Sequence, residues 1–288
     1  MKIGMTENWN IVEKGNPFRL KKILTDLLDY KDLILLFFKR DIKSSYQQTI
    51  LGPLWLIIQP IFTSIIFTIV FGNIAHIATP KGISPFAFYL LGLSFWNYFA
   101  DCFNRISSTF VSNAAVFGKV YFPRLTVPFS VLLSGLFRFG IQFILFIAVY
   151  FYGVLFQGYP IQLNFTLLLI PIYMLVICLL ALGSGLIVSS LTTKYRDLTM
   201  LVAFGVQLLM YATPIAYPFF AIASNSVFYK IIQLNPLTGI IEGCKYAFTS
   251  EGLFNAKLIL ADGVVAFAIC LSGFYVFSKV EKSFMDTV

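Results

Sequence analysis

Long apolar stretches alternate with short polar connections from about residue 50 to residue 278. A helix needs about 20 consecutive apolar residues to cross the hydrocarbon core of a bilayer. The pattern therefore predicts an all-α, polytopic membrane protein with six transmembrane helices. These lie at about 51–72, 86–100, 132–156, 165–191, 199–219 and 258–278, and the second is the shortest. No Gly/Ser-rich linker divides them, so we expect one transmembrane domain, residues 30–288, after a cytoplasmic segment, residues 1–29.

Positive charges are concentrated in alternate connections between these stretches. Sixteen Lys and Arg residues fall before the first span, in the loops 101–127 and 192–198, and in the C-terminal tail, whereas four fall in the other connections. Because cytoplasmic loops carry the excess of Lys and Arg, both termini are expected in the cytoplasm. About fifty residues, many of them charged, precede the first apolar run, so the start of the chain does not resemble a signal peptide.

Arg138 lies near the start of the third apolar stretch, and it is the one positive residue that the loops do not account for. Residues 139–156 are still almost long enough to span, so the side chain can extend to water at the cytoplasmic interface. The alternatives are that it binds an anionic head group or forms a buried ion pair.

Three shorter segments predict helices that do not cross the membrane. Residues 30–45 mix apolar positions at helical spacing with charges, which is typical of a helix lying in the membrane interface, either as an anchor or as a docking surface. The loop 101–128 is long enough for a short cytoplasmic helix that is either inert or a partner contact. In the external stretch 212–257, two moderately apolar pieces are separated by Asn235-Pro236, which favours two short helices that re-enter the membrane and line a path.

Composition supports a membrane protein and excludes several kinds of site. The chain is 58% hydrophobic and 12% charged, whereas soluble domains have about a quarter of their residues charged. We attribute the net charge of +8 to membrane topology and not to nucleic-acid binding. The four cysteines are far apart and form no CxxC pair, so neither a zinc site nor a disulfide framework is indicated.

The sequence motifs of common enzymes and pumps are missing. There is no GxxxxGK[ST] loop for ATP and no HExxH metal motif. Acidic residues are nearly absent from the spans: Asp101 and Asp262 fall at span ends, and Glu242 lies in the re-entrant region. Ion-coupled transporters and membrane enzymes both need buried acids or acid–base pairs. We therefore expect no catalytic residue, no metal and no cofactor in this chain, and an energy source, if it pumps, on a partner.

Four sequence blocks resemble the permeases of type-2 ABC exporters, and more narrowly those that export O-antigen, capsule or teichoic acid. They are Arg40-Asp41-Ile42-Lys43-Ser44-Ser45-Tyr46-Gln47-Gln48-Thr49-Ile50-Leu51-Gly52-Pro53-Leu54-Trp55 with Gln59-Pro60, then Tyr195-Arg196-Asp197-Leu198, Thr213-Pro214-Ile215 and Leu234-Asn235-Pro236. Each is weak alone, but together they occur in order over about residues 30–280 and on a matching topology. The extra residues at the N-terminus depart from the shortest members of the family.

The resemblance implies a homodimer of permeases with two copies of a separate ABC ATPase, which binds ATP and Mg. Residues 30–45 would be the interface helix, about 108–118 the coupling helix and about 220–248 the external gate helices. The residues implied to contact the ATPase are Leu36, Phe37, Arg40, Val111, Asn113, Phe117 and Lys119. The implied substrate is a polysaccharide attached to a polyprenyl diphosphate, whose charge Arg138 and Arg124, or Lys119, would meet by charge-assisted hydrogen bonds.

A path for a long glycan should offer many aromatic faces, on which sugars stack. The aromatic residues in or beside the spans are Trp55, Tyr89, Phe95, Trp96, Tyr98, Phe99, Tyr211, Tyr217 and Phe219. Aromatic residues at membrane interfaces are also common anchors. Two other functions stay open: a type-2 ABC permease for drugs or small lipids, and a membrane-embedded transferase, which would need clustered carboxylates or histidines.

Overall fold

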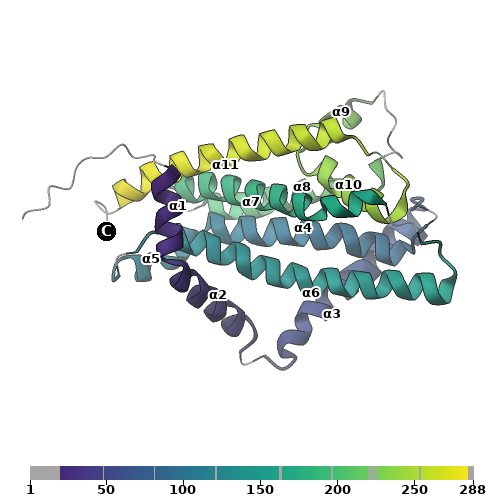
Figure 1. The fold of residues 1–288 in the computed structure, drawn as a ribbon, viewed down its shortest axis with the longest axis horizontal. Coiled ribbons are helices and arrows are strands. Elements are labelled where there is room, and N and C mark those ends of the chain that lie inside the picture. The colour runs from purple at the N-terminus through teal and green to yellow at the C-terminus, as the bar shows by residue number, and fades with distance from the viewer. Residues whose placement is uncertain are drawn as a thin grey trace, which may run out of the picture.

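The computed structural model describes residues 20–47, 49–80, 82–120, 122–161, 164–195, 197–219, 222, 226–252 and 254–284. Every regular element in these ranges is helical, which confirms the predicted all-α fold for them. The long helices α4 (Pro85–Ser107), α6 (Thr126–Gln157), α7 (Ile170–Thr192) and α11 (Ala256–Phe284) run side by side and form the body of the molecule (Figure 1).

Among the described residues, four helical stretches are long and apolar enough to cross a membrane. They are Gly52–Ile74, Thr126–Gln157, Phe165–Thr192 and Ala256–Glu281, and they coincide with four of the six predicted spans. The predicted span 86–100 lies within α4, which has 23 residues but carries several polar side chains towards its C-terminal end. The predicted span 199–219 begins as α8 (Leu198–Tyr211), which has 14 residues.

The first span is irregular at both ends. A 3₁₀ turn, Gly52–Leu54, leads into α3 (Trp55–Phe67), and the helix then widens into a π-helical segment, Thr68–Ile74. With α2 (Lys31–Tyr46), α3 forms a V-shaped pair below the bundle (Figure 1). Pro60 inside α3 supplies no backbone N–H, so one hydrogen bond of the helix is missing there.

Glycines allow the central helices to approach closely. A Cβ atom on Gly183 of α7 would lie 2.5 Å from the backbone Cα and N atoms of Cys270 on α11. A Cβ atom on Gly273 of α11 would meet the carbonyl oxygen of Gly183, so the backbones of the two helices are in direct contact. Small residues at such crossings are a common means of packing helices in membranes, where van der Waals contact drives association.

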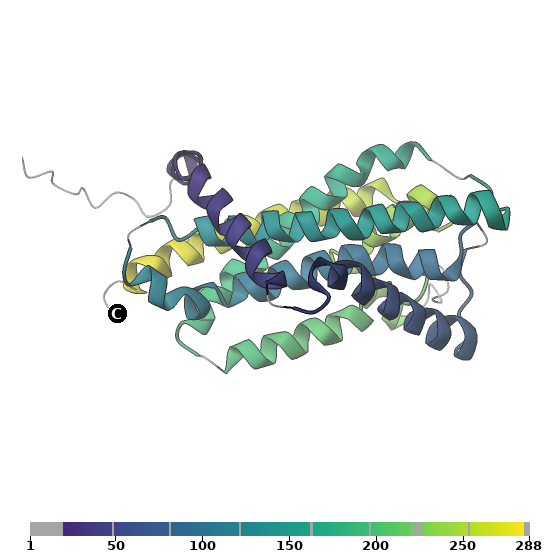
Figure 2. The same cartoon turned by 90° about the horizontal axis from the view of Figure 1, so that it is seen from below.

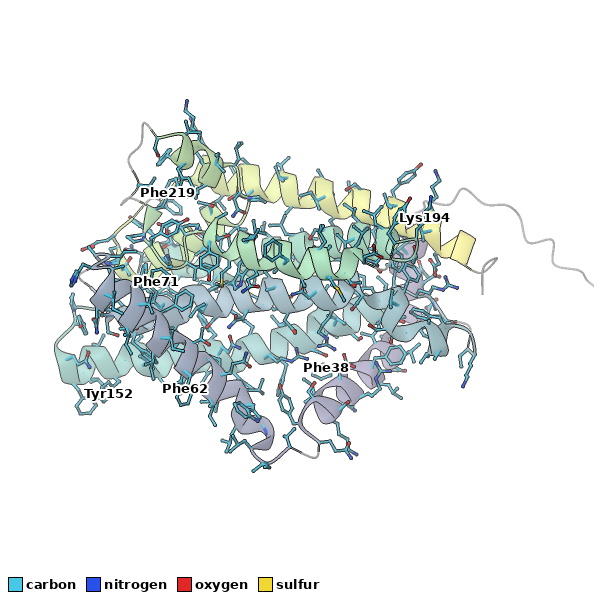
Figure 3. All side chains as sticks on the ribbon, turned by 180° about the vertical axis from the view of Figure 1, so that it is seen from behind. Phe38, Phe62, Phe71, Tyr152, Lys194 and Phe219 are labelled. Atoms are coloured by element: carbon cyan, nitrogen blue, oxygen red, sulfur yellow. The ribbon has the colours of Figure 1, made fainter. Side chains whose placement is uncertain are left out.

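The outer surface of the bundle is apolar. Phe62 of α3 is 61% exposed and Tyr152 of α6 is 56% exposed, and both point away from the bundle (Figure 3). Seen from below, α8 lies along the outside of the bundle (Figure 2), and of its residues Val206 alone is buried. So much exposed apolar surface suits a protein surrounded by lipid.

The two ends of the bundle carry different short helices. Helices α1 (Leu20–Asp29) and α5 (Thr109–Phe117) lie at the same end as the last turn of α11, whereas α9 (Val227–Gln233) and α10 (Thr238–Thr249) lie at the other (Figure 1). Helices therefore occupy the ranges predicted for the interface, coupling and gate helices, namely α2, α5, and the pair α9 and α10. Of the N-terminal segment 1–29, residues 1–19 lie outside the described residues.

Candidate functional site

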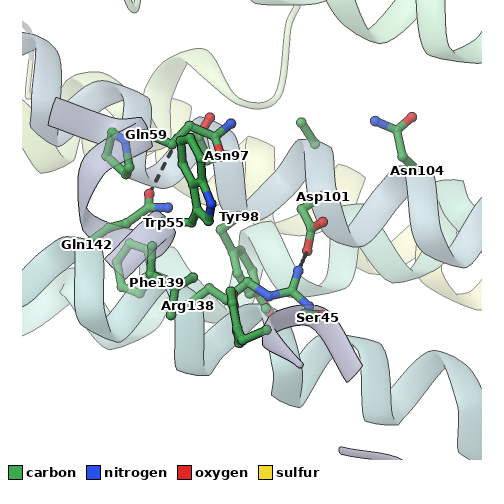
Figure 4. A pocket seen from close by; sticks show the side chains of 15 residues that line it. Ser45, Trp55, Gln59, Asn97, Tyr98, Asp101, Asn104, Arg138, Phe139 and Gln142 are labelled. Carbon is green, nitrogen blue, oxygen red and sulfur yellow. Dashed lines mark hydrogen bonds and ion pairs between the residues drawn. The ribbon is translucent and has the colours of Figure 1, made fainter. Parts of the chain in front are cut away.

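A cavity of about 370 Å³ lies where the C-terminal end of α2, the first half of α3, α4 and α6 converge. Its lining comes from stretches that are far apart in the sequence (Figure 4). The lining residues are Ser45, Tyr46, Trp55, Leu56, Gln59, Pro60, Asn97, Tyr98, Ala100, Asp101, Asn104, Gly135, Arg138, Phe139 and Gln142. The first sequence block that resembles the exporter permeases contributes five of these residues: Ser45, Tyr46, Trp55, Gln59 and Pro60.

Polar side chains at helical spacing face the cavity from two helices. On α4, Asn97, Asp101 and Asn104 recur every three or four residues, and on α6, Arg138 and Gln142 are four apart. Residues with these spacings lie on one face of a helix. In an apolar environment such a face must turn inward and find partners, so the polar stripes of α4 and α6 face each other across the cavity.

Hydrogen bonds and an ion pair join the two stripes. The Asn97 Nδ2 donates to the Gln142 Oε1 at 3.4 Å, and the Arg138 Nη1 donates to the Asp101 Oδ2 at 2.5 Å (Figure 4). Of the alternatives left open by the sequence, the structure thus places Arg138 in an ion pair. Burial raises the pKa of the Tyr46 phenol beside this pair, although the positive charge of Arg138 opposes the shift.

Aromatic rings supply the rest of the wall. The Trp55 side chain is 47% exposed and stands at the cavity, whereas Tyr98 and Phe139 are almost fully buried (Figure 4). Flat aromatic faces provide apolar contact, and amide side chains both donate and accept hydrogen bonds. This combination suits a ligand that has apolar faces and many hydroxyl groups, which is the chemistry of a carbohydrate.

Of the predicted aromatic path residues, Trp55 and Tyr98 line the cavity and the others do not. Four of the others are buried in packing along α4: Tyr89, Phe95, Trp96 and Phe99. Tyr211 is exposed at the end of α8, and its carbonyl accepts a hydrogen bond from the Tyr217 hydroxyl at 3.0 Å. Phe219 stacks on Tyr229 of α9, with ring centroids 4.5 Å apart. A place on a glycan path remains a prediction for each of these residues.

The amides Gln59, Asn97, Asn104 and Gln142 were not among the predicted site residues. The sequence does contain a signal for them, because an amide side chain within an apolar stretch is costly unless a partner is found. A partner cannot be read from the sequence, however, since Asn97 and Gln142 are brought together by helix packing.

The residues expected to contact an ATPase divide into an exposed set and a buried set. The exposed residues are Leu36, Arg40, Val111 and Lys119, and Asn113 is partly exposed. Phe37 of α2 and Phe117 of α5 are buried, and both pack against Phe122, with ring centroids 5.6 and 5.5 Å away. The two short helices therefore share one aromatic anchor.

Arg124, the second arginine predicted to meet a diphosphate, lies outside the cavity lining. Its side chain is buried, and its Nη1 donates to the carbonyl oxygen of Glu281 in the last turn of α11 at 3.0 Å. The guanidinium also lies over the rings of Phe110 and Phe117 of α5, 5.8 and 5.6 Å from their centroids. Arg124 thus connects α5 to the end of α11, and the structure does not bring it together with Arg138.

At the opposite end of the bundle, a second buried polar cluster holds α10. Lys245 and Glu242 form an ion pair at 3.4 Å, with both side chains less than 5% exposed. The Lys245 Nζ also donates to the carbonyl of Pro214 and lies 4.2 Å from the centroid of the Phe88 ring. The Asn235 Nδ2 donates to the Thr213 Oγ1 at 2.9 Å, so the third and fourth blocks that resemble the exporter permeases are in contact.

Known proteins similar to this chain are membrane transport proteins. A family described as ABC-2 type transporter matches residues 32–249 of the chain. The chain is 28% identical over 258 residues to an O-antigen export system permease protein, RfbA, of Klebsiella pneumoniae, which covers 88% of this chain and 94% of that protein. It is 22% identical over 268 residues to the protein of the same name from Myxococcus xanthus, covering 93% and 99%. It is 26% identical over 221 residues to the polysialic acid transport protein KpsM of Escherichia coli, covering 75% and 82%.

Proposed function

Since the chain belongs to the ABC-2 type transporter family, we propose that it is the transmembrane permease of an ATP-driven exporter that moves a lipid-linked polysaccharide across the cytoplasmic membrane. The similarity to O-antigen and polysialic acid transport proteins over most of their lengths supports this substrate class. The observation that carries the proposal is the cavity between α3, α4 and α6, whose amides and aromatic rings suit a sugar chain.

The proposed topology has six membrane spans, formed by α3, α4, α6, α7, α8 and α11, with both termini in the cytoplasm. The excess of Lys and Arg in alternate loops supports this orientation. The polar residues of α4 do not oppose it, because Asn97 and Asp101 have partners on α6. Helix α8 is short, and the chain from residue 212 to residue 219 would complete its crossing. Helices α9 and α10 would then re-enter from the outside.

The proposed assembly is a permease homodimer with two copies of an ABC ATPase, which holds ATP and Mg. The exposed residues Leu36 and Arg40 of α2, with Val111 of α5, would form the docking surface. The shared anchor at Phe122 supports a common role, because α2 and α5 pack against the same ring.

The proposed substrate carries a polyprenyl diphosphate. Of the two arginines considered for this group, Arg138 lies in the cavity wall and Arg124 does not. The Arg138 side chain is 16% exposed, and its Nε is buried without a hydrogen-bond partner. A guanidinium with an unused donor can donate a further hydrogen bond to a phosphate oxygen.

ATP hydrolysis and export by the same complex test this function. The purified permease should hydrolyse no ATP alone, whereas the complex co-purified with its ATPase should do so, and cells that express both should display the polysaccharide on their surface. Trp55→Ala should reduce export, and Phe62→Ala, on the outward face of the same helix, should leave it unchanged. If no ATPase co-purifies under any condition, the exporter function is wrong.

A further inference from the structure

Five charged side chains form a continuous chain across three helices, and it begins on α2, where the Nη2 of Arg40 donates to the Oδ1 of Asp41 at 3.1 Å. The Nη2 of Arg105 on α4 donates to the Oδ2 of Asp41 on α2. The Nη1 of Arg105 lies 4.0 Å from the Oδ2 of Asp101, one turn earlier on α4. The same Oδ2 accepts a hydrogen bond from Arg138 of α6 at 2.5 Å. Asp101 and Arg138 lie in the cavity wall, so the chain leads from α2 to the cavity.

Helix α2 carries different chemistry on its two faces. Phe37 and Asp41, four residues apart, face the bundle, and the Asp41 side chain is 11% exposed. Leu36 and Arg40 lie on the exposed face, where the proposed ATPase would dock. A force applied to the outer face therefore acts directly on the bond between Asp41 and Arg105, because both faces belong to one rigid helix.

The charge chain has unused hydrogen-bonding capacity. The Nη1 of Arg105 and the Nε of Arg138 are both buried and have no hydrogen-bond partner. Two guanidinium groups therefore flank one carboxylate oxygen of Asp101, and each has a donor to spare. Arg105 needs to move by only about 1 Å to bring Asp101 into hydrogen-bond range, which is 2.7–3.2 Å. The carboxylate of Asp101 can therefore bind Arg138 alone, as in the structure, or Arg138 and Arg105 together.

We propose that this charge chain couples the position of α2 to the electrostatics of the cavity, with Arg105 as the positioning residue. With α2 docked as in the structure, Asp41 holds Arg105, and Asp101 neutralises Arg138. When α2 moves away, Arg105 loses Asp41 and turns to Asp101. Asp101 is then shared between two guanidinium groups, and part of the charge of Arg138 becomes available to an anionic phosphate group in the cavity. The inference rests on the proposed function, because the ATPase supplies the movement of α2.

The test uses the full permease co-expressed with its ATPase. Asp41→Asn removes the carboxylate that links Arg105 to α2, while the side chain keeps its size. We expect export to fall about tenfold, the size of a typical coupling between sites, while the amount of complex and its ATP hydrolysis are kept. Lys43→Gln is the matched control, because it changes one charge on an exposed position of the same helix, and it should leave export unchanged.

A reciprocal exchange is the second variant. Asp41→Arg combined with Arg105→Asp rebuilds the link between α2 and α4 with reversed polarity, and it should export better than either single substitution. A purely structural role for Asp41 would instead lower complex yield, ATP hydrolysis and export in parallel. The exchange would then raise all three together, whereas the coupling predicts that export alone changes.

The outcomes distinguish the coupling from the function on which it rests. Export by Asp41→Asn at the wild-type level would overturn the coupling, as would a parallel loss of complex, hydrolysis and export, whether or not the exchange repairs it. If the wild-type complex itself neither assembles nor exports, the proposed function fails, and the coupling is overturned with it.

Discussion

The crossing of α7 and α11 predicts a sharp difference between two chemically identical substitutions. Gly183→Ala adds one methyl group at the closest approach of the two helices, where it would lie 2.5 Å from backbone atoms of Cys270 and 2.7 Å from the carbonyl carbon of Ile269. Gly140→Ala adds the same methyl group to α6, where nothing lies within 4 Å. Neither glycine has a left-handed backbone that would itself oppose alanine.

The expected magnitude follows from the distances. Carbon atoms prefer separations of about 3.5–4.0 Å, so the helices must separate by roughly 1 Å at Gly183, and a gap of this size forfeits a quarter to a half of the attraction between the facing atoms. The contacting atoms are backbone and cannot rotate away. We expect Gly183→Ala to destabilise the protein by about 2–3 kcal/mol. Alanine favours a helix over glycine by up to about 1 kcal/mol, so Gly140→Ala should be neutral or slightly stabilising.

Thermal unfolding in detergent measures this difference. The fraction of protein that elutes as a folded peak in size-exclusion chromatography after heating gives an apparent melting temperature for each variant. Gly183→Ala should melt several degrees below wild type, since about 1 kcal/mol corresponds to roughly 2–4 °C for a chain of this class. If it melts as high as Gly140→Ala, the close packing of α7 and α11 is not a source of stability.

Three further substitutions probe the other polar contacts. Arg124→Gln loses the charged hydrogen bond to the Glu281 carbonyl, worth about 1.5–3 kcal/mol. Because Arg124 also contacts α5, less ATPase should co-purify with the permease. An unchanged amount of co-purified ATPase would show that α5 does not need this bond. Lys245→Met leaves Glu242 buried without its partner and should cost about 3–5 kcal/mol in stability, measured by the same heating assay. The double variant with Glu242→Gln should recover part of that loss, and a double variant no better than the single would contradict the ion pair. Asn97→Leu should lower polysaccharide export at constant ATP hydrolysis. Export at the wild-type level would show that the Asn97 amide does not contact the substrate.

Hydropathy predicted the parts of the fold that depend on a local pattern. The stretches 132–156, 165–191 and 258–278 are predominantly apolar and long enough to span a bilayer, so a helix that pairs its own backbone groups is the structure expected there. The short helices α2 and α5 were also expected where they occur, although the evidence there came from resemblance and amphipathic spacing. Helix α4 extends to Ser107, beyond the predicted end of its span at residue 100, and the charged residues Asp101 and Arg105 in this extension have partners on α6 and α2.

The candidate site was predicted only in part, and the reason is tertiary. Trp55, Tyr98 and Arg138 were identified by residue type and position, and all three line the cavity. Tyr89 and Phe95 have the same residue chemistry but are buried in packing. Nothing in the local sequence distinguishes an aromatic ring that faces a cavity from one that faces a neighbouring helix, because the distinction depends on how α4 is rotated against α6.

The connection between the ends of α5 and α11 sets an order in biosynthesis. Helix α11 follows all the other described helices along the chain, so it is synthesised and inserted after them. Until it arrives, α7 lacks the neighbour that contacts Gly183, and Arg124 lacks the Glu281 carbonyl that holds it beneath α5. The surface proposed to recruit the ATPase is therefore completed last. A partly inserted chain would present an incomplete surface, which delays association with the ATPase until the membrane helices are in place.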